Sequence, residues 1–183
     1  MSSVLSETQI AFLETHCELF YYDETSPSGL RNRITRGRRA RLGDVSGSRD
    51  RKHWRVRVQN RTVGAHQLVW LLNGRRLTAG FELDHINRDG FDNRICNLRL
   101  VSPSLNRLNR MTQGSVPFKG VCFHKASGLF TAQKSINGVK HYLGCFKTAE
   151  EAATAWDLFC MENVPELDTS LLNFPETYGM RER

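Results

Sequence analysis

The stretch "LDHINRDGFDNRICNLRLVSPSLNRLNR", residues 83–110, decides the fold. In it an Asp-His pair follows a hydrophobic residue, and asparagines recur behind the pair. Asparagine is a poor former of helices and strands and usually stands in turns or caps. A single asparagine would indicate a turn, whereas an ordered series behind Asp84 and His85 indicates a functional site.

The residue types in this stretch suit the hydrolysis of a phosphodiester bond. That reaction needs a base for water, a cation on the phosphate oxygens and stabilisation of the leaving oxygen. The imidazole of His85 suits the base, since its free pKa of about 6.5 lies near working pH. The carboxylate of Asp84 and the amide oxygen of a downstream asparagine are hard ligands of the kind that Mg²⁺ prefers.

The end of the stretch predicts a helix that could complete such a site. Ser102 is a good N-cap and Pro103 a good first helical residue. A strand that presents Asp84 and a helix that presents Asn106 could then converge on one ion.

The spacing of these residues resembles the HNH motif of the ββα-metal nucleases, in the form found in phage-encoded HNH homing endonucleases. Asn97 follows His85 by 12 residues, and Asn106 follows Asn97 by nine. The resemblance covers about 45 residues, because His66 in "AHQLVW" stands where the family has an upstream histidine before a helix. It implies that His85 is the general base, that Asp84 and Asn106 hold the metal, and that Asn97 orients His85 and ties the ends of the ribbon together.

The resemblance also implies the cofactor and the products. The metal is expected to be Mg²⁺ or Mn²⁺, and cleavage should leave 5′-phosphate and 3′-hydroxyl ends. Two simpler interpretations stay open: Asp84-His85 as a capped turn without a metal, and His66 as a helix-start or core histidine with no more than a supporting place in the site. Gln67 stands where the family often has Arg, which leaves a phosphate contact from that position in doubt.

Positive charge is concentrated ahead of this motif. The chain carries a net charge of +7, which favours a polyanionic partner. Residues 31–61 hold twelve Lys or Arg against two acids, whereas residues 1–30 hold five acids and no Lys or Arg. In "HWRVRVQNRTVGAH" apolar residues alternate with Arg55 and Arg57, which predicts a hairpin with an arginine face for the DNA backbone. Beside Asn106, Arg107 and Arg110 are further candidate DNA contacts.

Outside the motif, the sequence pattern predicts helices over residues 4–17 and 66–73 and a strand–turn–strand over 19–34. Three strand-like runs follow at 119–125, 129–136 and 140–146, and Thr148 with Glu151 forms a capping box for a helix over 148–163.

This last group of elements, about residues 118–176, resembles the plant ethylene-response-factor (APETALA-type) DNA-binding domain. The shared marks are "KGV", "YLGCF", "TAEEAA" and the closing "LNFPE". The resemblance implies a sheet that enters the major groove, with the helix packed behind it. Strand alternation turns Gln133, Ser135, Lys140 and Tyr142 outward, and the resemblance implies DNA contacts at these positions. Lys119 and His124 lie on or near the same surface and are further candidates. That the face is only solvated, or binds a protein, stays open.

The five cysteines are not arranged in CxxC pairs. We therefore expect free buried thiols, a reducing cytoplasm, such as that of a phage-infected bacterial cell, and no structural zinc. There is no signal peptide and no apolar run of 18 residues, so no membrane partner is expected.

The sequence therefore predicts an α+β protein: a ββα-metal HNH nuclease core with an N-terminal β-rich arm, followed by a small three-stranded antiparallel sheet with one packed helix. The expected division is a basic arm (1–64), the nuclease core (65–110), a linker (111–117), the APETALA-type domain (118–176) and a tail (177–183).

The expected function is metal-dependent, site-selective cleavage of double-stranded DNA by a monomer or weak dimer. A non-cleaving, sequence-specific DNA-binding regulator that uses the C-terminal domain is the alternative. A structural or packaging DNA protein is a third.

Overall fold

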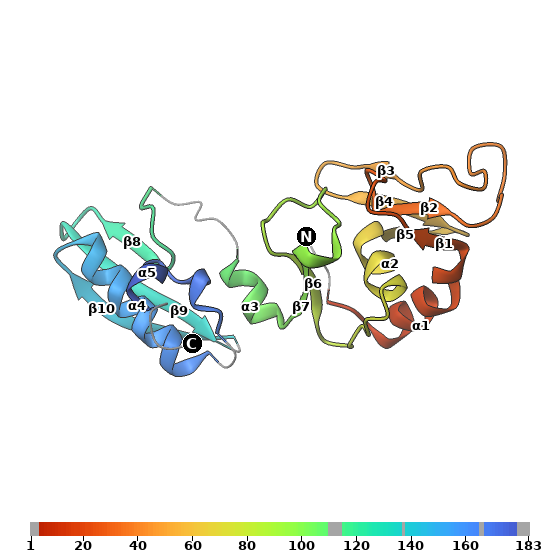
Figure 1. Cartoon of the computed structure of the whole chain (residues 1–183). Coiled ribbons are helices and arrows are strands. Elements are labelled where there is room, and N and C mark those ends of the chain that lie inside the picture. The colour runs from red at the N-terminus through yellow and green to blue at the C-terminus, as the bar shows by residue number, and fades with distance from the viewer. Residues whose placement is uncertain (1–3, 110–114, 137, 165–166, 179–183) are drawn as a thin grey trace. The chain divides into compact units, whose positions relative to one another are not determined.

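The computed structural model describes residues 4–109, 115–136, 138–164 and 167–178 (Figure 1). It is an α+β structure of helices and small antiparallel sheets, as the sequence predicts. By its contacts the chain divides into two compact units, Met1–Pro103 and Ser104–Arg183. The predicted linker 111–117 and tail 177–183 fall largely outside the described residues, and the predicted domain boundaries stay predictions.

The first unit contains, in chain order, α1 (Glu7–His16), η1 (Cys17–Leu19), β1 (Phe20–Tyr22), β2 (Leu30–Asn32), β3 (Ser48–Arg49), β4 (Trp54–Val58), β5 (Arg61–Gly64), α2 (Ala65–Leu72), β6 (Glu82–His85), η2 (Ile95–Asn97) and β7 (Leu98–Val101). The N-terminal helix, the strand–turn–strand and the second helix all lie where the sequence pattern predicts them.

A hydrophobic core runs through this unit. Leu13 of α1, Phe20 of β1, Val56 of β4, Leu68 of α2 and Leu83 of β6 are all buried in it. Each such side chain contributes about 1.5–3 kcal/mol by leaving water. The predicted arm and the predicted nuclease segment therefore share one core, which fixes β6 and α2 relative to each other.

The predicted arginine hairpin is present. Strands β4 and β5 pair antiparallel, with Arg55 opposite Gly64 and Val58 opposite Arg61. Gln59 in the bend has a φ of 49°, a left-handed conformation that a tight turn requires. The apolar residues of β4 are buried and Arg57 is exposed, so the strand has the two faces that its alternation predicts.

The start of α2 follows directly from the end of this hairpin. Gly64 is the N-cap residue, and its backbone N–H donates to Oε1 of Gln67 at 3.1 Å. Gln67 stands where the HNH family often has arginine, and its side chain accepts a hydrogen bond from a backbone N–H at the start of the helix. The helix stops at Asn73, and Gly74 follows with a φ of 72°. His66 is therefore held in the first turn of a well-defined helix.

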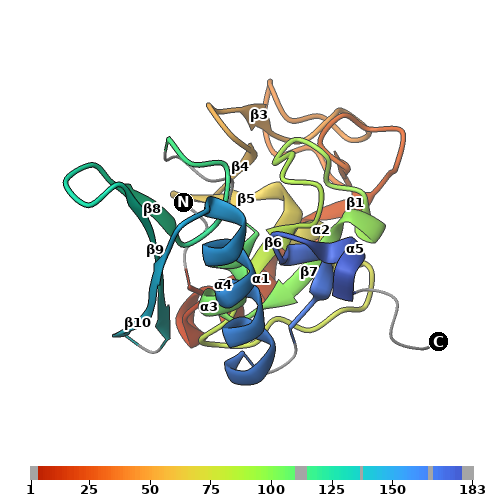
Figure 2. The same cartoon turned by 90° about the vertical axis from the view of Figure 1, so that its left-hand side faces the viewer.

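The second unit begins within the helix α3 (Pro103–Leu108), whose first residue alone belongs to the first unit. It contains β8 (Val121–His124), β9 (Leu129–Ile136), β10 (Val139–Phe146), α4 (Ala149–Asn163), η3 (Thr169–Leu171) and α5 (Pro175–Tyr178). The strands form one antiparallel sheet in the order β10-β9-β8. Figure 2 shows α4 lying along one face of this sheet, and Ala132 of β9 is buried with Ala152 and Ala153 of the helix. The predicted capping box of Thr148 and Glu151 is confirmed.

Close packing of the sheet against α4 depends on one glycine. Gly120 has a φ of 71°, and a side chain there would overlap the indole of Trp156 on α4. Leu105 and Leu108 of α3 pack with Trp156 as well. The helix that carries Asn106 therefore shares the core of the second unit.

The expectation of buried thiols is wrong for most of the cysteines. Only Cys160 is buried, whereas Cys96, Cys122 and Cys145 are exposed. Cys122 and Cys145 both stand opposite Thr131 in the sheet, on the face away from α4, so the strand pattern places them outward. Among the described residues, no helix has the length and apolar character needed to cross a bilayer.

Candidate active site

The Asp-His pair lies at the end of the β6–β7 ribbon. Asp84 stands opposite Arg99 and His85 opposite Leu98. Arg99 donates from both Nε and Nη2 to Oδ2 of Asp84, each at 3.3 Å. His85 is buried, whereas Asp84 is partly exposed. The strand thus carries a carboxylate and an imidazole on consecutive residues at its end.

The loop between the two strands is closed by Asn97. Its Oδ1 accepts from the backbone N–H of Asn87 at 3.0 Å, and its Nδ2 donates to the carbonyl of Asp92 at 2.7 Å. Its own carbonyl accepts from the N–H of Ile86 at 2.8 Å. These bonds join the start of the loop to its end and set the geometry in which His85 leaves the strand.

The imidazole of His85 is hydrogen-bonded by Asn93, which the sequence motif did not indicate, while the orienting role that the resemblance gives Asn97 stays a prediction. Nε2 of His85 lies 3.0 Å from Oδ1 of Asn93, and Nδ2 of Asn93 donates to the carbonyl of Ser28 at 2.9 Å. The bond to Ser28 fixes which end of the amide faces the imidazole. Because an amide oxygen only accepts, Nε2 must carry the proton, and Nδ1 of the neutral ring keeps its lone pair.

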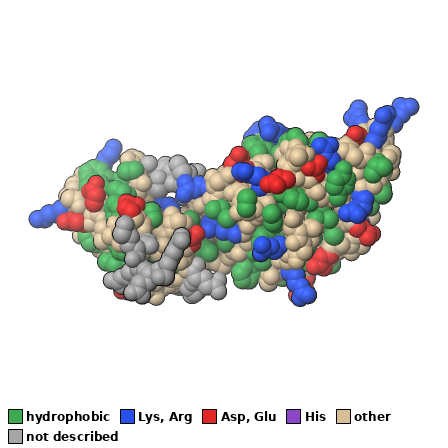
Figure 3. Space-filling view, in the orientation of Figure 1, with side chains coloured by type: hydrophobic (Ala, Val, Ile, Leu, Met, Phe, Trp, Pro, Cys, Tyr) green, Lys and Arg blue, Asp and Glu red, His purple; other side chains and the backbone are tan. Residues whose placement is uncertain are grey.

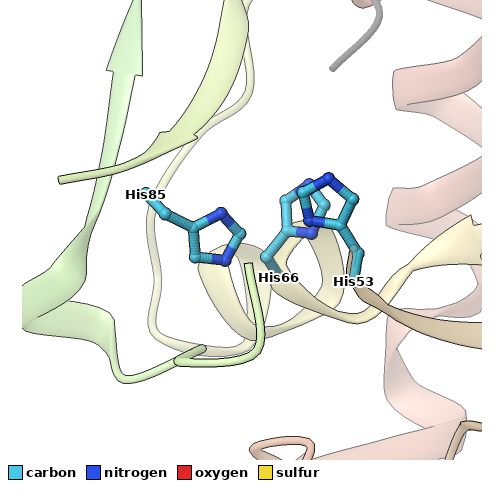
Figure 4. Close-up of side chains that lie close together, drawn as sticks. All are labelled: His53, His66 and His85. Atoms are coloured by element: carbon cyan, nitrogen blue, oxygen red, sulfur yellow. The ribbon is translucent and has the colours of Figure 1, made fainter. Parts of the chain in front are cut away.

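Two further imidazoles lie next to His85 (Figure 4). The ring centroids of His66 and His85 are 5.1 Å apart, and those of His53 and His85 are 5.6 Å apart. One nitrogen from each of the three rings lies within 4.8 Å of the other two. His66 is thus a neighbour of the predicted base, and His53 joins it although the sequence motifs indicated no role for His53.

A signal for His53 was present in the hairpin register. Arg55 pairs with Gly64, so the residue two positions before Arg55 and the residue two positions after Gly64 approach each other. Those residues are His53 and His66. The alternation of the hairpin residues predicts which side chains share a face, but it does not predict that His53 comes close to His66. For this reason the sequence motifs did not indicate His53.

Burial keeps the neighbouring imidazoles neutral. It lowers the pKa of His66 well below its ordinary value, and the nearby His85 and His53 lower it further. Burial also lowers the pKa of His53, with smaller contributions from His85 and Arg55. Within the described part of the chain, the buried Nδ1 atoms of His53 and His66 have no hydrogen-bond partner.

Two glycines leave the room that these rings occupy. A side chain at Gly64 would overlap the ring of His66. A side chain at Gly90, in the loop after His85, would overlap both the ring of His53 and the carbonyl of Lys52. The positions of both imidazoles therefore depend on glycines of the hairpin and of the β6–β7 loop.

Residues 63–108 match the model of a family described as HNH endonuclease. The match supports an HNH nuclease domain at these residues. The matched segment contains His66, Asp84, His85, Asn97 and Asn106, whereas His53 lies outside it. Searches of curated proteins and of solved structures gave no match.

The other predicted residues of the HNH segment lie on α3. Asn106 is buried and Arg107 is exposed. The contacts place this helix with the second unit, and the shared ion of Asp84 and Asn106 stays a prediction. Arg110 lies outside the described residues.

Much of the basic block is engaged within the first unit. Arg55 pairs with Asp50 through Nε at 2.8 Å, and Arg31 pairs with Asp23. The guanidinium of Arg36 stacks over Phe20 at 4.5 Å from the ring centre. Figure 3 shows Lys and Arg side chains interspersed with acidic ones on the face in view. The charge of residues 31–61 is thus only partly available to a DNA backbone, and the exposed Arg57 is the better candidate of the two hairpin arginines.

The predicted DNA face of the second unit is the sheet face opposite α4. Gln133 stands opposite Tyr142 and Ser135 opposite Lys140, so these four side chains share a face. Tyr142 is 64% exposed. His124 is exposed at the end of β8, while Lys119 donates from Nζ to the carbonyl of Leu171 at 2.6 Å. Lys119 therefore ties β8 to the C-terminal segment, and its DNA contact remains a prediction.

Proposed function

We propose that this protein is a metal-dependent endonuclease that hydrolyses phosphodiester bonds in double-stranded DNA, with His85 as the general base. One observation carries the proposal: the bond from Nε2 of His85 to Asn93, with Asn93 held by Ser28, leaves Nδ1 as the basic atom. A general base needs an unprotonated nitrogen in a defined orientation, and this hydrogen bond defines both the tautomer and the orientation of the ring. The HNH family match over residues 63–108 is consistent with this assignment.

In this reaction Nδ1 of His85 accepts a proton from water, and the water oxygen attacks phosphorus as the bond to the 3′ oxygen breaks. The residues present fit a hard cation, because Asp84 offers a carboxylate next to the base and Asn106 an amide oxygen. We assign Asp84 and Asn106 to Mg²⁺ or Mn²⁺. Such a cation, when bound, supplies positive charge to the phosphate oxygens and the leaving oxygen.

We further propose that the enzyme is of the phage homing type and that the second unit is an APETALA-type DNA-binding domain that selects the site. The supporting observation is an exposed polar sheet face, with Gln133 and Tyr142 paired across β9 and β10. Phosphate contacts from the hairpin would supply affinity, and base-edge contacts from the sheet would supply sequence choice. Because each chain has one HNH segment, a monomer would nick one strand.

The proposal is tested by incubating the full chain with supercoiled and linear DNA, with Mg²⁺ or with a chelator, and by mapping any new ends. We expect metal-dependent cleavage that leaves 5′-phosphate and 3′-hydroxyl ends at preferred sites. Site-selective binding without cleavage under all metal conditions would instead favour the DNA-binding regulator.

A further inference from the structure

Three histidines far apart in the sequence meet in the first unit, and the HNH motif accounts for only part of this cluster. One nitrogen from each of His53, His66 and His85 lies within 4.8 Å of the others, and Figure 4 shows the three rings gathered together. Around a tetrahedral Zn²⁺ with bonds of about 2.0–2.1 Å, ligand nitrogens are roughly 3.3 Å apart. Small side-chain rotations would therefore bring the three nitrogens to coordination distance.

We propose that His53, His66 and His85 form a binding site for a divalent transition cation such as Zn²⁺, and that filling this site stops DNA cleavage. The binding step stands on its own. The inhibitory step rests on the function proposed above.

Two of the three imidazoles have a buried nitrogen that a metal ion could satisfy. Nδ1 of His53 and Nδ1 of His66 are buried without a hydrogen-bond partner among the described residues, which is costly unless a ligand satisfies them. His85 uses Nε2 toward Asn93, so its Nδ1 is the atom that carries a lone pair for a metal. Metal-binding histidines usually donate their second N–H to an oxygen in this way. His53 is partly exposed, which gives an ion a side from which to enter.

The donor set selects a different class of cation from the one that cleavage needs. Three imidazoles suit Zn²⁺, Ni²⁺ or Cu²⁺, whereas Mg²⁺ prefers oxygen ligands and retains its water. The carboxylate of Asp84 next in the chain suits Mg²⁺ instead. The cluster therefore differs in chemistry from the predicted hard-metal pair of Asp84 and Asn106.

His85 belongs to this cluster and is also the general base of the proposed nuclease site, and this double role produces the inhibition. A cation held on Nδ1 occupies the lone pair that would otherwise take the proton from water. Mg²⁺ added in excess would not release it, because Mg²⁺ competes poorly for nitrogen ligands. A transition metal would thus switch off the base without displacing DNA.

Binding is measured by calorimetric titration of the untagged, metal-free full chain with Zn²⁺ in millimolar Mg²⁺ without DNA. Visible absorption with Co²⁺ reports the ligand class. We expect one ion per chain, with affinity at least about tenfold weaker for His53→Ala and for His66→Ala. The control His141→Ala, whose imidazole lies against Phe159 in the second unit with the ring centroids 5.2 Å apart, should bind as the wild type does. Equal affinity in all these proteins, or no stoichiometric binding, would overturn the site.

Two further variants separate binding by the histidines from binding by thiols and from loss of folding. Exposed thiols also bind zinc, so the titration is repeated with Cys96→Ser, Cys122→Ser and Cys145→Ser combined. Loss of binding in that protein would also overturn the site. If His53→Ala fails to fold, His53→Gln removes the imidazole while keeping a side chain of similar reach.

Inhibition is then measured as the Zn²⁺ concentration that halves each protein's own cleavage rate in Mg²⁺. We expect this concentration to rise at least about tenfold in His53→Gln. Unchanged cleavage by a zinc-loaded wild type would overturn the inhibitory step. A chain that binds zinc through these histidines but cleaves no DNA would refute the proposed nuclease function and leave the metal site supported.

Discussion

At the scale of single residues, the site depends on a short relay of hydrogen bonds. His85 ends strand β6, Asn93 lies in the loop that follows it, and Ser28 lies in the turn between β1 and β2. The amide of Asn93, held by Ser28, sets the tautomer of the His85 imidazole. We therefore expect Asn93 to be a positioning residue, whose effect on the proposed reaction would pass through His85.

Asn93→Ala should lower the cleavage rate by about 10–100-fold, the usual effect of losing a group that orients a ligand or base. The tautomer of His85 would no longer be fixed, so part of the population would present a protonated Nδ1 toward water. Single-turnover rates and DNA affinity are to be measured side by side. A merely structural role would instead weaken DNA binding and lower the melting temperature, with the rate constant of folded protein unchanged.

Asp84→Ala should reduce activity most at low Mg²⁺, because the variant lacks a carboxylate ligand. Asn106→Ala should show the same trend with a smaller loss, and excess metal should partly restore it. The measurement is cleavage rate as a function of Mg²⁺ concentration. Identical metal dependence in the wild type and both variants would remove Asp84 and Asn106 from the metal site.

At the scale of elements, local patterns were sufficient for most of the fold. Alternation in residues 54–58 predicted the buried and exposed faces of β4, and the capping box predicted the start of α4. His53 and Asn93 could not be found in this way. His53 reaches the site through the register of a hairpin, and Asn93 through the path of a loop. Neither the register nor the loop path follows from the spacing of the HNH motif.

Arg55 and Arg57 lie on the same strand and have equivalent places in the sequence pattern, but their surroundings in the structure differ. Arg55 is held by Asp50, and Arg57 is exposed. Arg57→Ala should therefore weaken binding to all DNA sequences and reduce the salt slope by about one per lost phosphate contact. Arg55→Ala should have a smaller effect, because its charge is already paired. Salt titrations of DNA affinity test this, and a larger change in slope for Arg55→Ala would refute it.

At the scale of the whole molecule, each unit has hydrophobic clusters of its own, and the proposed function gives each unit one task. The first unit holds the histidine cluster and the Asp-His strand, and the second presents a polar sheet face. The sequence resemblances predict cleavage by the HNH segment and site selection by the second unit, and site selection stays a prediction. They did not predict that α3, with Leu105 and Leu108, would pack into the core of the second unit. Cutting the chain before residue 118 would expose that helix, so substitutions are the cleaner test of each task.

Gln133→Ala with Tyr142→Ala should cost about 1–3 kcal/mol per lost base contact on the preferred site and less on random DNA. The exposed substitution Glu150→Gln on α4, away from that face, is the control. Binding to a mixed DNA pool reports the selectivity. If the double variant keeps the same preferences as the wild type, the sheet face has some other partner.

The most direct test of the central claim is the single-turnover cleavage rate of His85→Ala in Mg²⁺, compared with the wild type and with His141→Ala. Loss of a general base should reduce the rate by about 10²–10⁴-fold, while DNA affinity stays within a few fold. His141→Ala should cut as the wild type does. Cleavage by His85→Ala at the wild-type rate would contradict the assignment of His85 and, with it, the proposed nuclease site.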